Sequence, residues 1–147
     1  MIDLILRDSK LHPSAFIWRG PLSLSSVEDW ERARSLSVPR DLKQLWCLMG
    51  GGDLFDDSDA ILQPFGSEEY DLIEPASSVF WNKGLSRDYY VFHKGIVDSV
   101  FRRSDGAIFT LAPSGLSQVS QYIDLDEWYL KTVRSVYAEQ YGLEAFV

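Results

Sequence analysis

The chain has 147 residues, the length of one ordinary domain, and 46% of them are hydrophobic, which is enough for a sizeable core and excludes an intrinsically disordered protein. Its 22 Asp and Glu against 14 Lys and Arg give a formal net charge of −8, which disfavours direct binding of DNA or RNA. We therefore expect a single domain over residues 1–147.

The N-terminal sequence MIDLILRDSK contains a short apolar run with no basic leader and no small-residue cleavage site. No later segment has the length needed to span a bilayer. The single cysteine, Cys47, lies between Trp46 and Leu48 and cannot form an internal disulfide. We expect it to be a buried core thiol in a cytoplasmic protein, with no association with membranes.

Two helices are predicted in the first third of the chain. The segment LSSVEDWERARSL, residues 24–36, offers Ser25 or Ser26 as an N-cap and has an apolar face that includes Trp30. A second helix begins near Pro39, with apolar residues spaced as on one helix face: Leu42, Leu45, Trp46 and Met49. The three glycines at 50–52 are expected to end it.

From residue 60 the pattern changes to short β-rich runs: AILQPF, DYYVFH, DSVFRR and AIFTLA. Asp105 and Gly106 lie between the last two runs and predict a two-residue hairpin turn. An antiparallel meander is therefore expected in the middle of the chain.

The segment DLDEWYLKTVRSVYAEQYGL, residues 124–143, predicts a long C-terminal helix. Asp124 or Asp126 can cap its start, Gly142 can end it in the left-handed conformation, and Leu143 can pack back on the helix. The predicted class is α+β, with N-terminal helices, a central antiparallel β-sheet (a meander) and a C-terminal helix packed on the core.

The acidic excess is concentrated in one segment. No basic residue occurs between Lys43 and Lys83, whereas residues 53–74 contain eight acids, and removing these from the 22 leaves 14 acids against 14 bases. The eight are Asp53, Asp56, Asp57, Asp59, Glu68, Glu69, Asp71 and Glu74. Such a concentration creates a local negative potential that attracts cationic partners, although a solvated acidic loop without a partner gives the same pattern.

The glycine run before these acids fits neither a phosphate loop nor a calcium loop. A phosphate loop needs a strand before its glycines and a Lys-Ser/Thr pair after them, whereas these glycines end a helix and precede acids. Counted from Asp53, the third and sixth positions of a calcium loop would be Phe55 and Ser58, which breaks that pattern. Asp56, Asp57 and Asp59 could bind an adventitious cation, but we expect no functional metal site and no cofactor.

The sequence gives only weak evidence for a catalytic site. His93 could be combined with Ser99 and with Asp98 or Asp105 into a triad, but no G-x-S-x-G motif is present, and sequence neighbours on a strand point to opposite faces. The adjacent acids Glu68 and Glu69 are poorly spaced to face each other across a glycoside. We expect a structural histidine and no enzymatic activity.

One tryptophan is a further candidate for contact with a partner. Trp30, Trp46 and Trp128 fall on apolar helix faces and are expected in the core. Trp81 lies in the polar, turn-rich sequence SSVFWNKGLSRDYY and is a candidate exposed anchor for a protein partner.

Several stretches together resemble the SUKH superfamily, in particular its bacterial Smi/Knr-like members. They are FIWRGP, LSVPRDLKQLWCLMGGGDLFDDSDAIL, YVFHKGIVDSVF and DEWYLKTVRSVYAEQYGL, which extend over most of the chain from Trp18 to Leu143. The order of Val38-Pro39, a short helix, glycines, an acidic-aromatic loop and a Trp-Tyr helix carries the resemblance. This chain has aspartates where relatives tend to carry a glutamate after the glycine turn.

The resemblance implies an α+β domain and an immunity protein that binds a polymorphic toxin, often a nuclease, without turning over a substrate. We hypothesise that the acidic segment forms one outward negative surface that binds a basic toxin domain. Its candidate contact residues are Asp53, Phe55, Asp56, Asp57, Asp59, Glu68, Glu69, Asp71 and Trp81. The alternative is a regulatory or scaffold domain without a toxin partner, and the sequence sets no oligomeric state.

Overall fold

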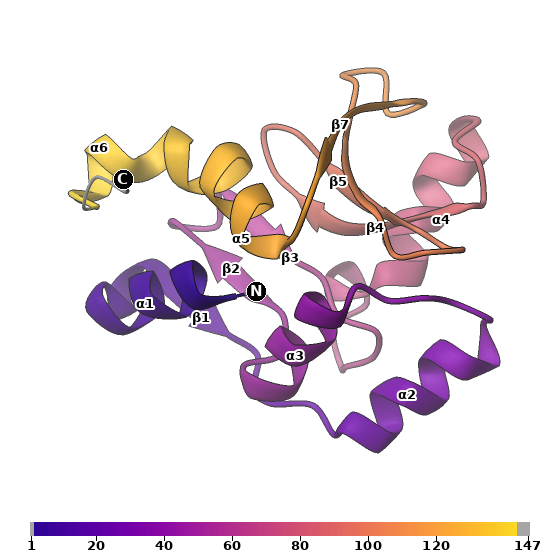
Figure 1. Cartoon of the computed structure of the whole chain (residues 1–147), viewed down its shortest axis with the longest axis horizontal. Helices are drawn as coiled ribbons and strands as arrows, with labels where there is room; N and C mark the ends of the chain where they lie inside the picture. The colour runs from indigo at the N-terminus through magenta and orange to yellow at the C-terminus, as the bar shows by residue number, and fades with distance from the viewer. Residues whose placement is uncertain (1, 144–147) are drawn as a thin grey trace.

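The computed structural model describes residues 2–143 and has an α+β fold, as predicted (Figure 1). The helices are α1 (Asp3–Leu11), α2 (Leu24–Ala33), α3 (Arg40–Leu48), α4 (Ile73–Lys83), α5 (Leu125–Trp128) and α6 (Ser135–Tyr141). The strands are β1 (Phe16–Trp18), β2 (Gly52–Leu54), β3 (Asp59–Ile61), β4 (Tyr89–Lys94), β5 (Ser99–Arg102), β6 (Ile108–Leu111) and β7 (Gln118–Tyr122).

The seven strands of the described residues form one antiparallel sheet in the order β1-β2-β3-β4-β5-β6-β7, so the predicted meander is confirmed and extends further than expected. The acidic segment contributes β2 and β3, which pair with each other around the turn at residues 55–58. Where β3 ends, Gln63 forms a parallel bridge with Leu72. This bridge folds the second half of the acidic segment back against the first.

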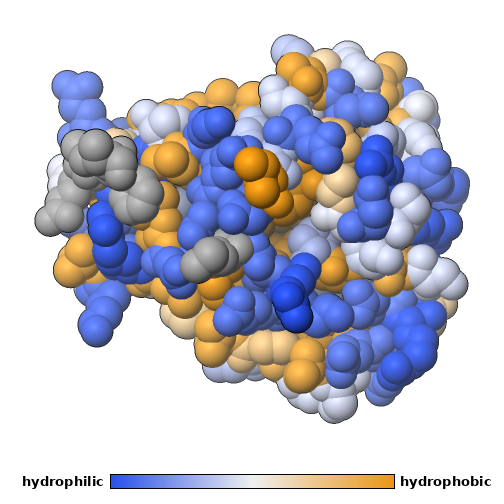
Figure 2. Space-filling model, viewed as in Figure 1, coloured by the Kyte–Doolittle hydropathy of each residue, from blue (hydrophilic) through white to orange (hydrophobic). Residues whose placement is uncertain are grey.

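The core lies between the sheet and the helices, and its largest fully buried side chains include Trp46, Trp128, Tyr129 and Phe92. Trp46 of α3 donates its Nε1–H to the carbonyl oxygen of Leu62 at 2.9 Å. On the face seen in Figure 2, apolar residues are scattered among polar ones and are not gathered in one area. Within the described residues no helix has the length and apolar character needed to cross a membrane.

Both N-terminal helices that the sequence predicts are present, with two corrections. The N-cap of α2 is Ser23, whose hydroxyl accepts from the N–H of Ser26, and not Ser25 or Ser26. Cys47 is half-exposed on α3, not buried. Gly50 follows α3 with a φ of +79°, and a Cβ there would collide with the carbonyl oxygen of Gly20, so glycine is required at this position.

α4 is a helix where the sequence suggested turns, and this corrects the prediction for Trp81. Trp81 lies in α4, where it is half-buried, and its Nε1–H donates to the carbonyl oxygen of Tyr89 at 2.8 Å. Its ring packs edge-on against Tyr90 at 5.0 Å. A side chain held in this way joins α4 to β4, so the structure does not present Trp81 as an exposed anchor.

The hairpin between β5 and β6 is longer than predicted. Phe101 pairs with Ile108, and the N–H groups of Arg102 and Gly106 donate to the carbonyl oxygens of Ala107 and Arg102. The loop therefore spans residues 103–106 and is not a two-residue turn. Gly106 has the left-handed conformation, with a φ of +71°.

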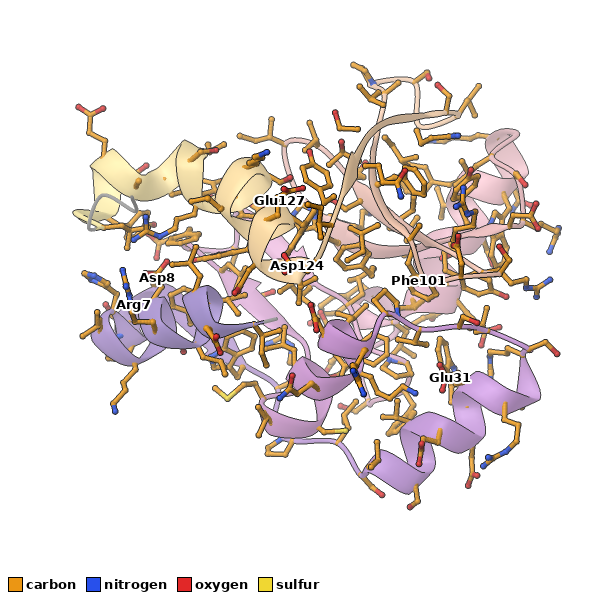
Figure 3. All side chains as sticks on the ribbon, viewed as in Figure 1. Arg7, Asp8, Glu31, Phe101, Asp124 and Glu127 are labelled. Carbon is orange, nitrogen blue, oxygen red and sulfur yellow. The ribbon has the colours of Figure 1, made fainter. Side chains whose placement is uncertain are left out.

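The terminal helix, residues 125–141, is formed by α5, a π-helical stretch (Tyr129–Arg134) and α6. Asp124, labelled with Glu127 in Figure 3, caps it by accepting from the N–H of Glu127 at 2.9 Å. Gly142 ends it in the left-handed conformation, and the N–H of Leu143 donates to the carbonyl oxygen of Ala138. Both predicted ends are confirmed, whereas the π-helical stretch has no counterpart in the sequence prediction.

Candidate functional site

The acidic turn between β2 and β3 has an unusual backbone. Phe55, Asp56 and Asp57 have φ values of 54°, 57° and 65°, three consecutive non-glycine residues in the left-handed region. Each such residue is strained, so neighbouring groups must hold the turn in place. The turn exposes Asp56, Asp57 and Ser58, while Phe55 is completely buried.

Aromatic residues of the terminal helix hold this turn. The Phe55 ring stacks on Tyr137 at 4.9 Å and lies 5.0 Å from Tyr141. The Tyr141 hydroxyl donates to Oδ2 of Asp56. Phe55 therefore anchors the turn to the core, and this corrects its assignment as a contact residue.

We expect the Tyr141–Asp56 hydrogen bond to be visible in a tyrosine titration. The bond raises the pKa of Tyr141 to about 12, above the ordinary value of about 10, because it stabilises the protonated phenol. Its stabilising contribution is therefore complete below pH ~10 and is lost as the pH rises through the folded-state pKa. Asp56→Asn should lower the pKa of Tyr141 in an ultraviolet titration, whereas Asp57→Asn should leave it unchanged. Identical curves for both variants would contradict this assignment.

Arg19 neutralises two of the predicted contact residues. Its Nη2 lies 2.8 Å from Oδ2 of Asp53, and its Nε lies 3.1 Å from Oδ2 of Asp71. Arg19 follows β1, which pairs with β2 and brings Asp53 close, while the bridge at Gln63 places Asp71 on the other side. Two carboxylates that share one guanidinium are poorly available to a cationic partner.

Asp59 is part of a buried hydrogen-bonded network. His93 lies between Asp59 Oδ1, at 2.5 Å from Nε2, and Ser99 Oγ, at 2.9 Å from Nδ1. The indole Nε1–H of Trp128 donates to the same Ser99 oxygen at 2.8 Å. Each N–H and O–H group of the network has an acceptor if the Trp128 indole donates to Ser99 Oγ, the Ser99 hydroxyl donates to His93 Nδ1, and His93 Nε2–H donates to Asp59 Oδ1. Gly95 leaves room for this network, because a Cβ there would collide with Asp59 Oδ1.

The network resembles the triad drawn from the sequence, but its acid is Asp59 and not Asp98 or Asp105. A shift of register between β4 and β5 places His93 directly opposite Ser99, and the pairing of β3 with β4 brings Asp59 to the imidazole. Ser99 and His93 have no exposed surface, and Asp59 is 4% exposed. A substrate cannot reach the Ser99 hydroxyl in this position. The hydrogen bonds among Asp59, His93 and Ser99 therefore stabilise the core.

The remaining acids of the segment differ in their surroundings. Glu74 forms an ion pair with Arg34 at 2.7 Å. Asp57, Glu68 and Glu69 are exposed, and within residues 2–143 their carboxylates form no ion pair or side-chain hydrogen bond. Asp57 precedes β3, whereas Glu68 and Glu69 follow it. The other acids are paired inside the protein with Arg19, Arg34, His93 and Tyr141, so the eight acids do not form the single negative surface expected from the sequence.

Glu68 and Glu69 belong to an exposed surface centred on Tyr70, which we call the Tyr70 surface. Tyr70 is 73% exposed, and Val79, which comes from α4, is 50% exposed. A groove of about 440 Å³ lies here. It is lined by Glu69, Tyr70, Pro75, Ala76, Val79 and Lys94. An exposed aromatic ring beside unpaired carboxylates can contribute both apolar contact and charge to an interface.

The sequence prediction missed the internal partners of the acids, namely Arg19, His93, Arg34 and Tyr141. Each lies far from its acid in the chain, and only strand pairing and helix packing bring the two together. Within the described residues, no group of three or more His, Cys, Asp or Glu side chains is placed to share a metal ion.

A comparison of the chain with protein-family models found no match, and a comparison with curated proteins found none either. The relation to the SUKH superfamily thus stays a prediction from the sequence motifs.

Proposed function

We propose that this chain is an immunity-type protein that binds and neutralises a cognate toxin, such as a nuclease, with the Tyr70 surface against a basic region of the toxin. The SUKH-like order of motifs supports the immunity role. The observation that carries the mode of binding is that Glu68 and Glu69, unpaired in the described structure, directly precede the highly exposed Tyr70. Tyrosine is one of the residues on which binding energy concentrates in protein interfaces.

Charge should accelerate this association more than it tightens the complex. Exposed carboxylates attract a basic partner over a distance that salt limits to ~8 Å at physiological ionic strength. The other acids of the segment, paired with Arg19, Arg34 and His93, instead keep the local backbone in place.

The test is calorimetric titration with the product of the neighbouring gene at low and at physiological salt. We expect Glu68→Gln/Glu69→Gln to weaken binding at least roughly tenfold at low salt and less at high salt. Tyr70→Ala should cost roughly thirtyfold at both salt concentrations, as for a central aromatic contact.

The matched control is Asp57→Asn/Glu139→Gln, which removes the same charge from exposed acids at the turn and in α6. This variant should bind as the wild type does. A loss of binding in the control but not in the Glu68/Glu69 variant would move the interface to the strained turn. A complete lack of binding to the neighbouring product would reject the immunity role and favour a scaffold domain.

A further inference from the structure

We propose that the groove of the Tyr70 surface recognises a dipolar segment of its partner, which places an arginine and a carboxylate on one face of an extended backbone. This inference rests on the proposed function and specifies the kind of toxin segment that the surface binds. The groove has a volume of about 440 Å³ and is lined by charged side chains of both signs, Glu69 and Lys94. A purely basic segment would match only one of these two charges.

Both charges of the groove are available to a ligand. Glu69 and Lys94 are exposed, and within residues 2–143 neither side chain forms an ion pair or a side-chain hydrogen bond. They do not pair with each other although they line the same groove. A ligand can therefore reach each of them without breaking an internal contact. A segment with a cation for Glu69 and an anion for Lys94 is the one that matches the groove in charge.

The rest of the lining favours arginine as the cation. Tyr70 contributes an exposed aromatic ring, and α4 contributes three apolar residues, Pro75, Ala76 and Val79. A planar guanidinium can stack on the ring of a tyrosine while it donates two parallel hydrogen bonds to one carboxylate. The ammonium group of lysine lacks this planar pair of donors. The aliphatic stem of an arginine can also cover the exposed side chain of Val79.

The backbone on both sides of the groove is held in place before a partner binds. Tyr70 lies in a single 3₁₀ turn, Glu69–Asp71, and Arg19 binds the carboxylate of Asp71 at 3.1 Å. The carbonyl oxygen of Asp71 accepts from the N–H of Gln63 at 2.9 Å. On the other side, the end of β4 pairs with β3. Binding therefore has to order only side chains, which limits its entropic cost.

Lys94 separates recognition of a dipolar segment from general attraction of a basic one. The chain has a net charge of −8, so the removal of a lysine makes it more negative and should strengthen the attraction of a uniformly basic segment. If Lys94 instead binds a carboxylate of the partner, its removal leaves that carboxylate unpaired and weakens the complex. The two modes of binding thus predict changes of affinity in opposite directions.

The first test titrates two peptides, acetyl-Arg-Ala-Asp-amide and acetyl-Arg-Ala-Asn-amide, into the full chain and follows its backbone amides by NMR. Side chains two residues apart lie on one face of an extended backbone. The Asn peptide has the larger positive charge, yet we expect the Asp peptide to bind roughly threefold more tightly, with a dissociation constant on the order of millimolar. Lys94→Gln should abolish this preference. Lys10→Gln removes the same charge from an exposed position of α1 and should keep it. Absence of binding, equal binding of the two peptides by the wild type, or an unchanged preference in Lys94→Gln would overturn the proposal.

The second test repeats the calorimetric titration with the product of the neighbouring gene. Lys94→Gln should weaken that complex roughly fivefold, whereas Lys10→Gln should bind as the wild type does. Equal or tighter binding by Lys94→Gln, together with weaker binding by Glu68→Gln/Glu69→Gln, would overturn the dipolar segment and leave the proposed function intact. A complete lack of binding would reject the proposed function, and the preference between the two peptides would then decide alone whether the groove recognises a dipolar segment.

Discussion

Replacing Arg134 by methionine is expected to lower the free energy of unfolding by about 3–5 kcal/mol, the usual cost of leaving one charge of a buried ion pair without its partner. Arg134 lies in the π-helical stretch and contacts Asp8 of α1, with Nε 2.7 Å from Oδ2 and Nη2 3.2 Å from Oδ1. The two side chains are only 3% and 2% exposed. Asp8 points from α1 toward the terminal helix (Figure 3).

Without Arg134, the Asp8 carboxylate would keep one strong donor, the Tyr129 hydroxyl at 2.7 Å. Burial, together with this bond, raises the pKa of Tyr129, so the phenol stays protonated and continues to donate at neutral pH. One neutral hydroxyl donor does not compensate the buried Asp8 carboxylate for the loss of the charged guanidinium. We therefore expect α1 to detach from the terminal helix before the sheet unfolds.

Urea denaturation of the wild type and Arg134→Met measures the loss, and the double variant Asp8→Leu/Arg134→Met is the control. Removing both charges should recover most of the stability, because the desolvation cost disappears with the pair. Arg32→Met, which removes an exposed arginine from an ion pair with Asp29, should change stability by no more than about 1 kcal/mol. Equal losses for Arg134→Met and Arg32→Met would show that the buried pair contributes little.

The parts of the fold predicted correctly are those with a local signal. α2, α3 and the terminal helix each have apolar residues at helical spacing and a recognisable end, and Gly142 marks one of these ends. α4 was missed because Pro75 and two serines give it a weak helical pattern, and its helical conformation depends on packing. Ser77, for example, accepts the N–H of Val91 in β4 at 2.8 Å. Short strands such as β1 and β2 carry too few residues for alternation to be visible.

The candidate site was harder to predict because charge in the sequence does not reveal how the charge is paired. All eight acids of residues 53–74 looked equivalent, yet Asp53 and Asp71 share Arg19 and Asp59 bonds with His93. These pairings depend on the register of β1, β3 and β4. Strand register cannot be predicted from a single sequence. Only Glu68, Glu69 and Asp57 retain exposed carboxylates without an internal partner in the described residues. The sequence therefore identifies the acidic segment, and only the fold shows which of its acids have no internal partner.

The second large effect is expected for Ser99→Ala, which should cost about 2–6 kcal/mol of unfolding free energy. The substitution removes the hydroxyl that accepts from Trp128 and donates to His93, so it leaves two fully buried polar groups without partners. Each orphaned group costs about 1–3 kcal/mol. Ser135→Ala removes an exposed hydroxyl of the terminal helix and should change stability by no more than about 0.5 kcal/mol.

Asp59→Asn separates the structural role of this network from a role in partner binding. The amide keeps an oxygen that can accept from His93 Nε2, so we expect a smaller loss of stability than for Ser99→Ala in the same urea titration. Because Asp59 is 4% exposed, the folded variant should bind the neighbouring gene product with unchanged affinity. A weakened complex formed by a fully folded Asp59→Asn protein would mean that the turn at 55–58 opens on binding and releases this carboxylate to the partner. An unchanged free energy of unfolding for Ser99→Ala would show instead that a water molecule replaces the lost hydroxyl. The hydrogen-bonded network would then be accessible to water.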